Sequence, residues 1–338
     1  MQNLPLLPVM GIGSAATPGW LHLFRERSRA GAVGPVDLEE AFADATRLAI
    51  ADQIEAGFDV IADGELARLR FVYEMYDRLT GLERVPPARR LGVPGYDRAP
   101  RFRAERVAAP HGLGLVAEYH RLREFCPDRP LKVALPGPLT FAGNIDTAQP
   151  AAMLDMLTEI VAAEVTALLA AGATFVQLDE PGLTHLPYGL EPTDAAERLN
   201  AITRLAPERI AVHVCFGNNA SRPYAPRDFA RLMPALRRLD CAMLLLEFTN
   251  REMAELELLP DLAARTRIAA GVVDVKSFHV ESPQDVAMRI HRVLAHVPAA
   301  RLALTADCGF SAIPRGLALA KMRALGAGAR LVRRELGL

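Results

Sequence analysis

Short runs of consecutive apolar residues recur along the chain, and most are followed by a stretch with apolar residues at helical spacing. Uninterrupted apolar runs are typical of strands buried on both faces, as in a parallel sheet covered by helices. The predicted strands are Val9–Ser14, Phe58–Glu65, Leu131–Pro136, Thr174–Asp179, Ile210–Phe216, Ala242–Phe248, Ile268–Asp274 and Leu302–Asp307. The predicted helices include Leu38–Ala56, Pro150–Ala171, Asp194–Leu205, Pro226–Leu239 and Pro283–His296.

The strand count and the positions of polar residues favour a barrel over an open sheet. Eight strands with intervening helices fit a (β/α)8 TIM barrel, whose site lies at the carboxyl ends of the strands. A doubly wound sheet would gather its polar residues at one switch point instead. Here they end nearly every strand: Ser14, Asp63, Glu65, Asp179, Glu180, His213, Cys215, Glu247, Asp274, Asp307 and Cys308. We therefore expect a single α/β barrel domain over residues 1–338.

The stretch from Leu66 to Pro110 interrupts this repeat. It is rich in Arg and Pro and links the second strand to the helix before the third. A connection of this length in a compact domain is usually functional or flexible. A disordered loop, a β-hairpin and a lid over the site all fit, and we expect a partly ordered lid.

Composition and charge exclude several classes of protein. A hydrophobic fraction of 51% and a charged fraction of 23% are typical of a folded globular chain. Lys plus Arg number 39 and Asp plus Glu 40, which argues against a nucleic-acid partner. Four cysteines are too few for a disulfide scaffold and indicate a reducing compartment.

The apolar segments do not have the pattern of a signal peptide or a membrane span. No basic stretch precedes the apolar N-terminal residues, and the later run 151–178 carries Asp155, Glu159 and Glu164 at helical spacing. Carboxylates at such positions would be costly inside a bilayer. We expect a cytoplasmic protein with no membrane partner.

Four residues at strand ends have the chemistry of a metal site. His213 and Cys215 are two apart on a predicted strand, so their side chains share a face. Glu247 and Cys308 end two later strands, and a closed barrel would bring all four to one mouth. An imidazole, two thiols and a carboxylate suit Zn²⁺ better than Mg²⁺ or Ca²⁺.

Each of these residues also has a simpler explanation. A single cysteine is most often a small buried apolar side chain, which is how we interpret Cys126 and Cys241. His213 alone fits a buried barrel histidine, and Glu247 alone fits a helix cap. The spacing of these residues alone does not distinguish a metal site from four separate structural roles.

A series of short motifs carries a resemblance to a known family. In chain order they are IGS (12–14), ADGE (62–65), GPLT (137–140), QLDEP (177–181), HVCFGN (213–218), LLEF (245–248), GVVDVKS (271–277) and ADCG (306–309). Together they resemble the C-terminal catalytic barrel of cobalamin-independent methionine synthases, from Val9 to the last helix. The family's separate N-terminal barrel, which helps to bind the polyglutamyl folate donor, has no counterpart here.

The resemblance implies a zinc-dependent transfer of a methyl group to the thiol of homocysteine. The family's zinc ligands fall on His213, Cys215, Glu247 and Cys308. Coordination to zinc deprotonates a substrate thiol, which otherwise has a pKa of about 8.5, and the thiolate then attacks the donor carbon. One ligand, for which Glu247 is the candidate, has to move when the thiol arrives.

The resemblance also assigns residues to the amino-acid part of homocysteine. The family's contacts fall on Ile12, Gly13, Ser14, Glu65 and Asp179. The first three receive the carboxylate, and the two acids take the ammonium group, a sensible arrangement for a cation. The alternative is that the two acids form structural ion pairs, with Arg68 or Arg70.

Three positions depart from the family pattern on the donor side. Asn144 stands near the position of a Trp that stacks on the pterin, His185 replaces a Glu that contacts folate, and Lys276 replaces an acid His. We therefore expect a donor other than polyglutamyl methyltetrahydrofolate, such as a methylated corrinoid protein or a simpler folate. Lys276, Asp274 and His185 are the candidate catalytic residues, and Asp274 and Asp307 are candidates for supporting the metal site.

Three other functions remain as alternatives. Related single-barrel enzymes add coenzyme M to epoxides and must bind a sulfonate, which the Arg-rich stretch would suit and the two pocket acids would repel. A decarboxylase of the uroporphyrinogen type shares the barrel and needs no such metal set. A non-catalytic zinc or thiol-binding protein would have a closed site that never exchanges a ligand.

Overall fold

A row of six parallel strands forms most of the centre of the molecule. The computed structural model describes residues 4–68, 73–86, 100–218, 222–223 and 225–338. The strands pair in chain order: β3 (Val133–Pro136), β5 (Val176–Asp179), β6 (Ile210–Val214), β7 (Met243–Leu246), β8 (Arg267–Val273) and β9 (Leu302–Ala306). Each matches a predicted strand, with ends that differ by a few residues.

The first two predicted strands close the row into a ring through isolated parallel bridges. Val9 pairs with Leu304 of β9, Met10 pairs with Val60, and Ile61 pairs with Leu131 just before β3. Backbone hydrogen bonds accompany these pairs, for example from Met10 N to the Leu304 oxygen at 3.0 Å. The two edges of the sheet are thus joined through both segments, and the predicted (β/α)8 barrel is confirmed.

The interior of the ring and its outer surface are both apolar, which explains the uninterrupted apolar runs. One cluster fills the inside and includes Met10, Val60, Ala211, Met243 and Leu245. A much larger cluster lies between the strands and the helices. Alternate residues of a strand point to opposite faces, so a strand covered on both sides needs apolar residues at every position.

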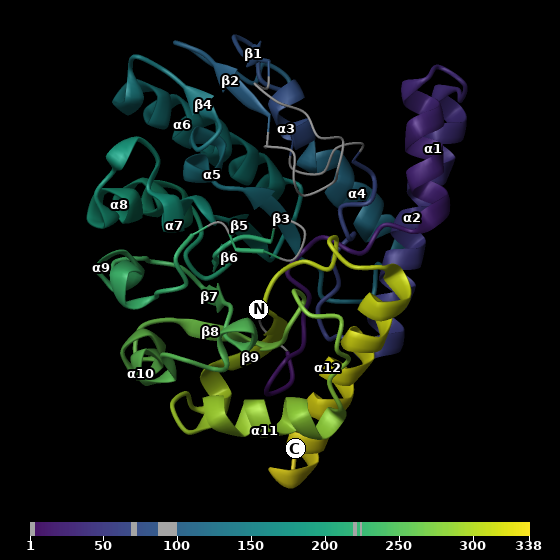
Figure 1. Ribbon diagram of the computed structural model, residues 1–338, viewed down its shortest axis with the longest axis vertical. Coiled ribbons are helices and arrows are strands. Elements are labelled where there is room, and N and C mark those ends of the chain that lie inside the picture. The colour runs from purple at the N-terminus through teal and green to yellow at the C-terminus, as the bar shows by residue number, and fades with distance from the viewer. Residues whose placement is uncertain (1–3, 69–72, 87–99, 219–221, 224) are drawn as a thin grey trace.

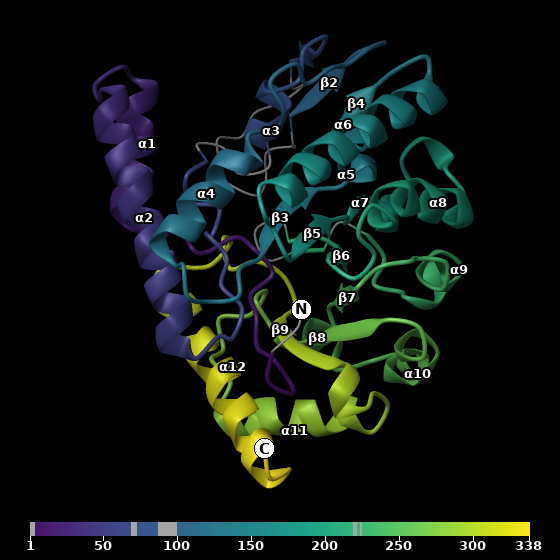
Figure 2. The same cartoon turned by 180° about the vertical axis from the view of Figure 1, so that it is seen from behind.

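Helices surround the strands in Figures 1 and 2. Helix α1 (Gly19–Arg29) lies beside α2 (Pro35–Ala56), and short helices α3 (Glu74–Asp77), α5 (Pro138–Ala142) and α7 (Gly182–His185) follow strand ends. The longer outer helices are α4 (Leu115–Phe125), α6 (Pro150–Ala170), α8 (Pro192–Thr203), α11 (Pro283–Leu294) and α12 (Arg315–Glu335). Single 3₁₀ turns are η2 (Pro187–Gly189), η4 (Thr249–Arg251), η5 (Leu256–Leu258) and η6 (Ala299–Arg301).

Local signals set the ends of the helices. Pro35 begins α2, where a missing N–H costs nothing, and Gly57 ends it at φ 86°, a left-handed conformation that glycine tolerates. Ser282 caps α11 by accepting a hydrogen bond from Asp285 N, and the Asp285 side chain bonds back to the Ser282 backbone.

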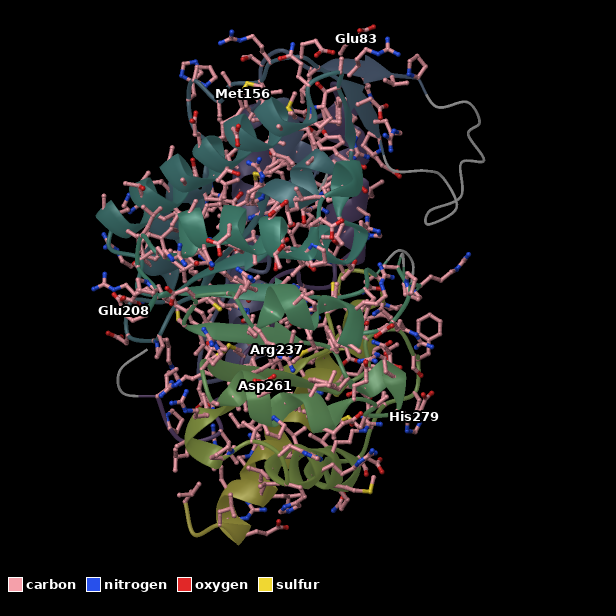
Figure 3. The ribbon with its side chains drawn as sticks, turned by 90° about the vertical axis from the view of Figure 1, so that its left-hand side faces the viewer. Glu83, Met156, Glu208, Arg237, Asp261 and His279 are labelled. Atoms are coloured by element: carbon pink, nitrogen blue, oxygen red, sulfur yellow. The ribbon has the colours of Figure 1, made fainter. Side chains whose placement is uncertain are left out.

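The predicted helix Pro226–Leu239 was wrong in length. The structure has only a 3₁₀ turn, η3 (Ala230–Leu232), and the four-residue helix α9 (Met233–Leu236). Pro234 in α9 has no N–H to continue a longer helix through this point. Arg237, just after α9, forms an ion pair with Asp261 of α10 (Leu259–Ala263), and Figure 3 labels both side chains.

The predicted insertion contains a short hairpin. Strands β1 (Glu83–Val85) and β2 (Arg101–Arg103) pair antiparallel, and β2 pairs parallel with β4 (Ile145–Asp146), at the top of Figure 1. Tyr76 of α3 packs against Phe102 of β2, with ring centroids 4.8 Å apart. Residues 69–72 and 87–99 of the insertion lie outside the described residues. Whether the segment acts as a lid stays a prediction.

Candidate metal and substrate site

A cavity of about 650 Å³ opens at the carboxyl ends of the strands. Its volume is typical of a small-molecule site. The lining includes Ile12, Ser14, Glu65, Asp179, His213, Cys215, Cys308 and His185 from the predicted site, together with Tyr76, Arg68, Asn144 and Ser311. Residues far apart in the sequence meet here because the strand ends converge.

His213, Cys215 and Cys308 form a compact cluster in the wall of this cavity. One ligand atom from each lies within 4.8 Å of the others. The two sulfurs are 3.8 Å apart. A tetrahedral zinc ion with Zn–S bonds of about 2.3 Å would hold two thiolates about 3.8 Å apart. The spacing of the sulfurs therefore fits this metal.

Two buried atoms of the predicted ligands lack partners among the described residues. They are His213 Nε2 and Glu247 Oε1. Asp179 Oδ1 lies 2.9 Å from the other ring nitrogen, Nδ1, so the lone pair of the imidazole is left on Nε2. A bound cation would satisfy both buried acceptors. The donor set and the unsatisfied atoms fit zinc.

Glu247 itself does not belong to the three-residue cluster. It is fully buried after β7, and its Oε2 lies 2.6 Å from Lys276 Nζ. The structure thus brings three of the four predicted ligands together and pairs the fourth with a lysine.

The electrostatics of the cluster favour one thiolate. The hydrogen bond between the sulfurs lowers the pKa of Cys308 to about 7 and raises that of Cys215. Burial opposes the charged form of His213, but the hydrogen bond and charge of Asp179 raise its pKa overall. Lys276 keeps a raised pKa despite burial, because Glu247 lies beside it.

Glu65 lies against the loop that contains Gly13. Its backbone has a φ of 58°, and a Cβ added at Gly13 would overlap its Oε1. Burial raises the pKa of Glu65 to about 8, even though Arg68 Nη1 lies 3.2 Å from its Oε2. Arg68 also forms two-pronged hydrogen bonds with Glu118. The ion pair with Arg68 considered as an alternative is present, and Arg70 lies outside the described residues.

A buried lysine that sequence reasoning missed supports the same pocket. Lys132 Nζ donates to the Ile12 oxygen at 2.8 Å and to Gln177 Oε1 at 2.5 Å. Gln177 in turn donates to Ile12 and, at 2.6 Å, to Asp179 Oδ1. Burial lowers the pKa of Lys132 to about 7. The only signal in the sequence was a lysine at the start of an apolar strand.

Three other predicted residues, Asp274, His185 and Asp307, differ in whether they line the cavity or support the chain around it. Asp274 Oδ1 accepts a hydrogen bond from Lys276 N at 2.7 Å, so it supports the loop rather than lining the cavity. His185 lines the cavity, and burial lowers its pKa. Asp307 accepts backbone hydrogen bonds from the residues after Glu247.

Ser311 and Asn218 extend the site beyond the predicted residues, and Asn144 lines the cavity as well. Asn144 Nδ2 donates to the Tyr76 hydroxyl at 3.1 Å. Ser311 Oγ lies 3.3 Å from Ser14 Oγ, and Asn218 Nδ2 donates to the Gly309 oxygen next to Cys308. Ser311 and Asn218 lie several residues after the ends of their strands. Their positions in the sequence therefore did not predict that they line the cavity.

Lysine has an unusual distribution in this chain. Only three of its 39 basic residues are lysines, namely Lys132, Lys276 and Lys321. The side chain of Lys276 is 6% exposed, and the other two are almost fully buried. Each ammonium group is bonded to buried acceptors rather than to solvent.

The fold and the cluster define a class: (β/α)8 barrel proteins with a thiol- and imidazole-rich site at the barrel mouth. Within this class, the chain belongs to the family described as "Cobalamin-independent synthase, Catalytic domain", whose sequence model matches residues 7–330. The predicted family resemblance is confirmed. No helix in the described part of the chain has the length and apolar character needed to cross a membrane.

Named relatives agree with this family. The chain is 28% identical to a methionine synthase of Saccharolobus solfataricus, over 99% of this chain and 98% of that protein. It is similar in structure to a B12-independent methionine synthase from Shewanella sp. W3-18-1 solved in complex with selenomethionine. That comparison has a TM-score of 0.82 and 26% identity, and covers 98% of this chain and 99% of the other. A putative vitamin-B12-independent methionine synthase from Listeria monocytogenes shares the fold, with a TM-score of 0.73 at 19% identity over 97% of this chain and 99% of the other.

Proposed function

We propose that this protein is a zinc-dependent methyltransferase that methylates the thiol of homocysteine. The observation that carries the proposal is the cluster of His213, Cys215 and Cys308, in which His213 Nε2, like the buried Oε1 of nearby Glu247, has no partner in the described part of the chain. These four residues would hold the metal. Zinc bound there would supply deprotonation and orientation of the substrate thiol.

The amino-acid end of the substrate would bind beside Glu65. Buried Glu65 and its partly buried neighbour Asp63 have raised pKa values, about 8 and about 6, because desolvation penalises both carboxylates. Arg68 balances only part of this negative charge, since it also pairs with Glu118. A substrate ammonium would stabilise the ionised carboxylates.

Asp179 and the loop at residues 12–14 would complete the amino-acid pocket. The two contacts of Asp179, to Gln177 and His213, use Oδ1 and not Oδ2. One carboxylate can therefore orient the His213 ring and also accept from the ammonium. Ser14, which lines the cavity with Ile12, would donate to the substrate carboxylate, as would backbone N–H groups near Gly13.

The methyl donor would bind along the part of the cavity wall that contains Asn144 and Tyr76. The Asn144 amide donates a hydrogen bond to the Tyr76 hydroxyl, and His185 also lines the cavity. The described lining residues include no Trp to stack on a pterin, which supports a donor bound differently from polyglutamyl methyltetrahydrofolate. We propose a simpler folate or a methylated corrinoid protein, with residues 66–110 acting as a lid within the single barrel domain.

The charged residues around the cavity support binding of coenzyme M less well than binding of homocysteine. Arg68 contacts Glu65 and Glu118, and Arg101 at the cavity edge contacts Asp146. Both guanidinium groups are paired with carboxylates, and the two pocket acids, Glu65 and Asp179, would repel a sulfonate. All four cysteines are free, which supports a reducing cytoplasmic location.

Metal analysis combined with calorimetry tests the proposal. The purified protein should contain about one equivalent of zinc and release protons when it binds homocysteine, but not bind coenzyme M. Cys308→Ser should lose most of the metal, whereas Cys126→Ser, at a buried cysteine outside the cluster, should retain it. Metal retained in full by Cys308→Ser would refute the ligand assignment.

A methyl-transfer assay then separates the donors. Polyglutamyl methyltetrahydrofolate, its monoglutamyl form and a methylated corrinoid protein would each be offered with homocysteine, and methionine would be measured. Methionine formed only from a polyglutamyl folate would contradict the donor proposal while leaving the zinc site intact.

A further inference from the structure

Glu247 and Lys276 form a buried ion pair at the edge of the cysteine and histidine cluster. Glu247 is fully buried, and the Lys276 side chain is 6% exposed. Oε2 of the carboxylate lies 2.6 Å from Nζ, while Oε1 has no partner among the described residues. One oxygen is therefore satisfied by the lysine, and the other remains available for a cation.

The backbone beside Glu247 is fixed. Asp307 Oδ1 accepts hydrogen bonds from Phe248 N and Thr249 N, each at 2.9 Å, and Oδ2 accepts from Asn250 N at 2.7 Å. A carboxylate that receives three consecutive N–H groups holds the chain after β7 in one conformation. Any change in the position of the Glu247 carboxylate must then come from its side-chain torsions.

The loop that carries Lys276 is fixed as well. Lys276 N donates to Asp274 Oδ1 at 2.7 Å, and Asp274 N donates to Glu281 Oε1 at 2.9 Å. Glu281 is in turn paired with the buried Lys321 of α12 at 2.9 Å. The lysine thus faces Glu247 from a rigid support.

We infer that Lys276 is a positioning residue that receives the Glu247 carboxylate whenever a substrate thiol displaces it from the metal. The inference rests on the proposed zinc site. A buried carboxylate released from a cation is strongly unfavourable unless another positive group compensates it. Lys276 provides that compensation, so it lowers the energy needed for Glu247 to leave and makes room for the thiol.

Zinc affinity in a double-mutant cycle tests this inference. Lys276→Met removes the second partner of Glu247, so zinc should bind about tenfold more tightly in competition with a chromophoric chelator. In a Glu247→Gln background the same lysine substitution should change zinc affinity little. Lys276→Arg keeps the cation as a control, and Lys276→Gln replaces Lys276→Met should that variant not fold.

The absorption spectrum of the cobalt(II) form provides a readout independent of activity. In the wild type, homocysteine should replace Glu247 and leave the intense bands of a four-coordinate ion. In Lys276→Met, Glu247 should remain bound when the thiol adds, and the bands should weaken as the coordination number rises.

The outcomes separate this inference from the proposed function. A wild-type protein without zinc would overturn the metal site itself. Zinc bound by the wild type with the same affinity in Lys276→Met would overturn the inference alone. An equal effect of Lys276→Met with and without Glu247 would show that the lysine acts on the cluster by its charge and not through Glu247, which also overturns it.

Discussion

Asp179 Oδ1 lies 2.9 Å from Nδ1 of His213, and this contact joins the amino-acid pocket to the candidate metal site. A carboxylate at Nδ1 accepts a hydrogen bond from the ring N–H and leaves the lone pair on Nε2, the state in which an imidazole binds a metal. The same carboxylate is held by Gln177, which Lys132 holds in turn. The orientation of His213 therefore depends on a chain of buried polar residues.

Asp179→Asn should weaken metal binding by about 10- to 100-fold, because the amide is a poorer acceptor for the Nδ1 proton. Competition with a zinc chelator measures this change. Asp146→Asn is the matched control, since Asp146 also lines the cavity but pairs with Arg101. Equal affinity in Asp179→Asn and the wild type would show that the contact does not support the metal.

Binding of methionine, which has an ammonium group but no thiol, should depend on pH through Glu65. The pKa of Glu65 is raised to about 8, so the free protein holds this carboxyl mostly protonated at pH 6 to 7. An ammonium group favours the ionised form, so binding releases a proton and tightens as pH rises, by up to about tenfold per pH unit. Calorimetry at several pH values measures the slope. Glu65→Gln should flatten it, and an unchanged slope would exclude Glu65.

Gly13→Ala should impair the amino-acid pocket without affecting the metal. An added Cβ would overlap Glu65 Oε1, so the carboxylate has to move away. Methionine affinity should fall about tenfold, while zinc affinity stays near the wild-type value. Gly19→Ala in α1 serves as the control, because no atom lies within 4 Å of its added Cβ. Unchanged methionine binding in Gly13→Ala would argue against Glu65 as the ammonium partner.

Gly137→Ala should destabilise the fold by about 1–3 kcal/mol. Its added Cβ would overlap buried Glu180 Oε2, and Glu180 accepts hydrogen bonds from Leu139 N and the Thr140 hydroxyl at the start of α5. Urea denaturation measures the loss. Gly143→Ala, where the nearest atoms are 3.6 Å from the added Cβ, should stay within about 0.5 kcal/mol of the wild type. Similar losses in both variants would show that the contact with Glu180 is not the cause.

The barrel strands could be predicted from the sequence because burial on both faces leaves a simple signal. Runs such as Ile210–Val214 are buried at every position, and all but one of the residues in this run are apolar. Helix α12 gave a weaker signal, since it contains Gly326 and Gly328, which lower helix propensity. An added Cβ there would overlap Ala56 or Val286, so close packing on α2 and α11 requires these glycines.

The candidate site was partly predictable for a geometric reason. Strand ends converge in a barrel, so residues at those ends, such as His213 and Cys308, could be placed together from their positions in the sequence. The partner of Glu247 could not be placed in this way. Lys276 lies on a loop that is held through Asp274, Glu281 and Lys321, and the last two residues are 40 positions apart in the sequence. Lys132 was missed because a single lysine within an apolar run does not indicate that its ammonium group is bonded to Ile12 O and Gln177 Oε1.

The burial of all three lysines also makes the native protein a poor substrate for lysine chemistry. Lys132, Lys276 and Lys321 each have an ammonium group bonded inside the fold, while the basic surface consists of arginines. Amine acylation of lysine and cleavage by a lysine-specific protease then require the chain to open. When opening and closing are fast relative to cleavage, the cleavage rate reports the population of the open form. Cleavage near Lys276 would report opening of the loop between Asp274 and Glu281, beside the candidate metal site. Cleavage near Lys132 would report opening of the barrel.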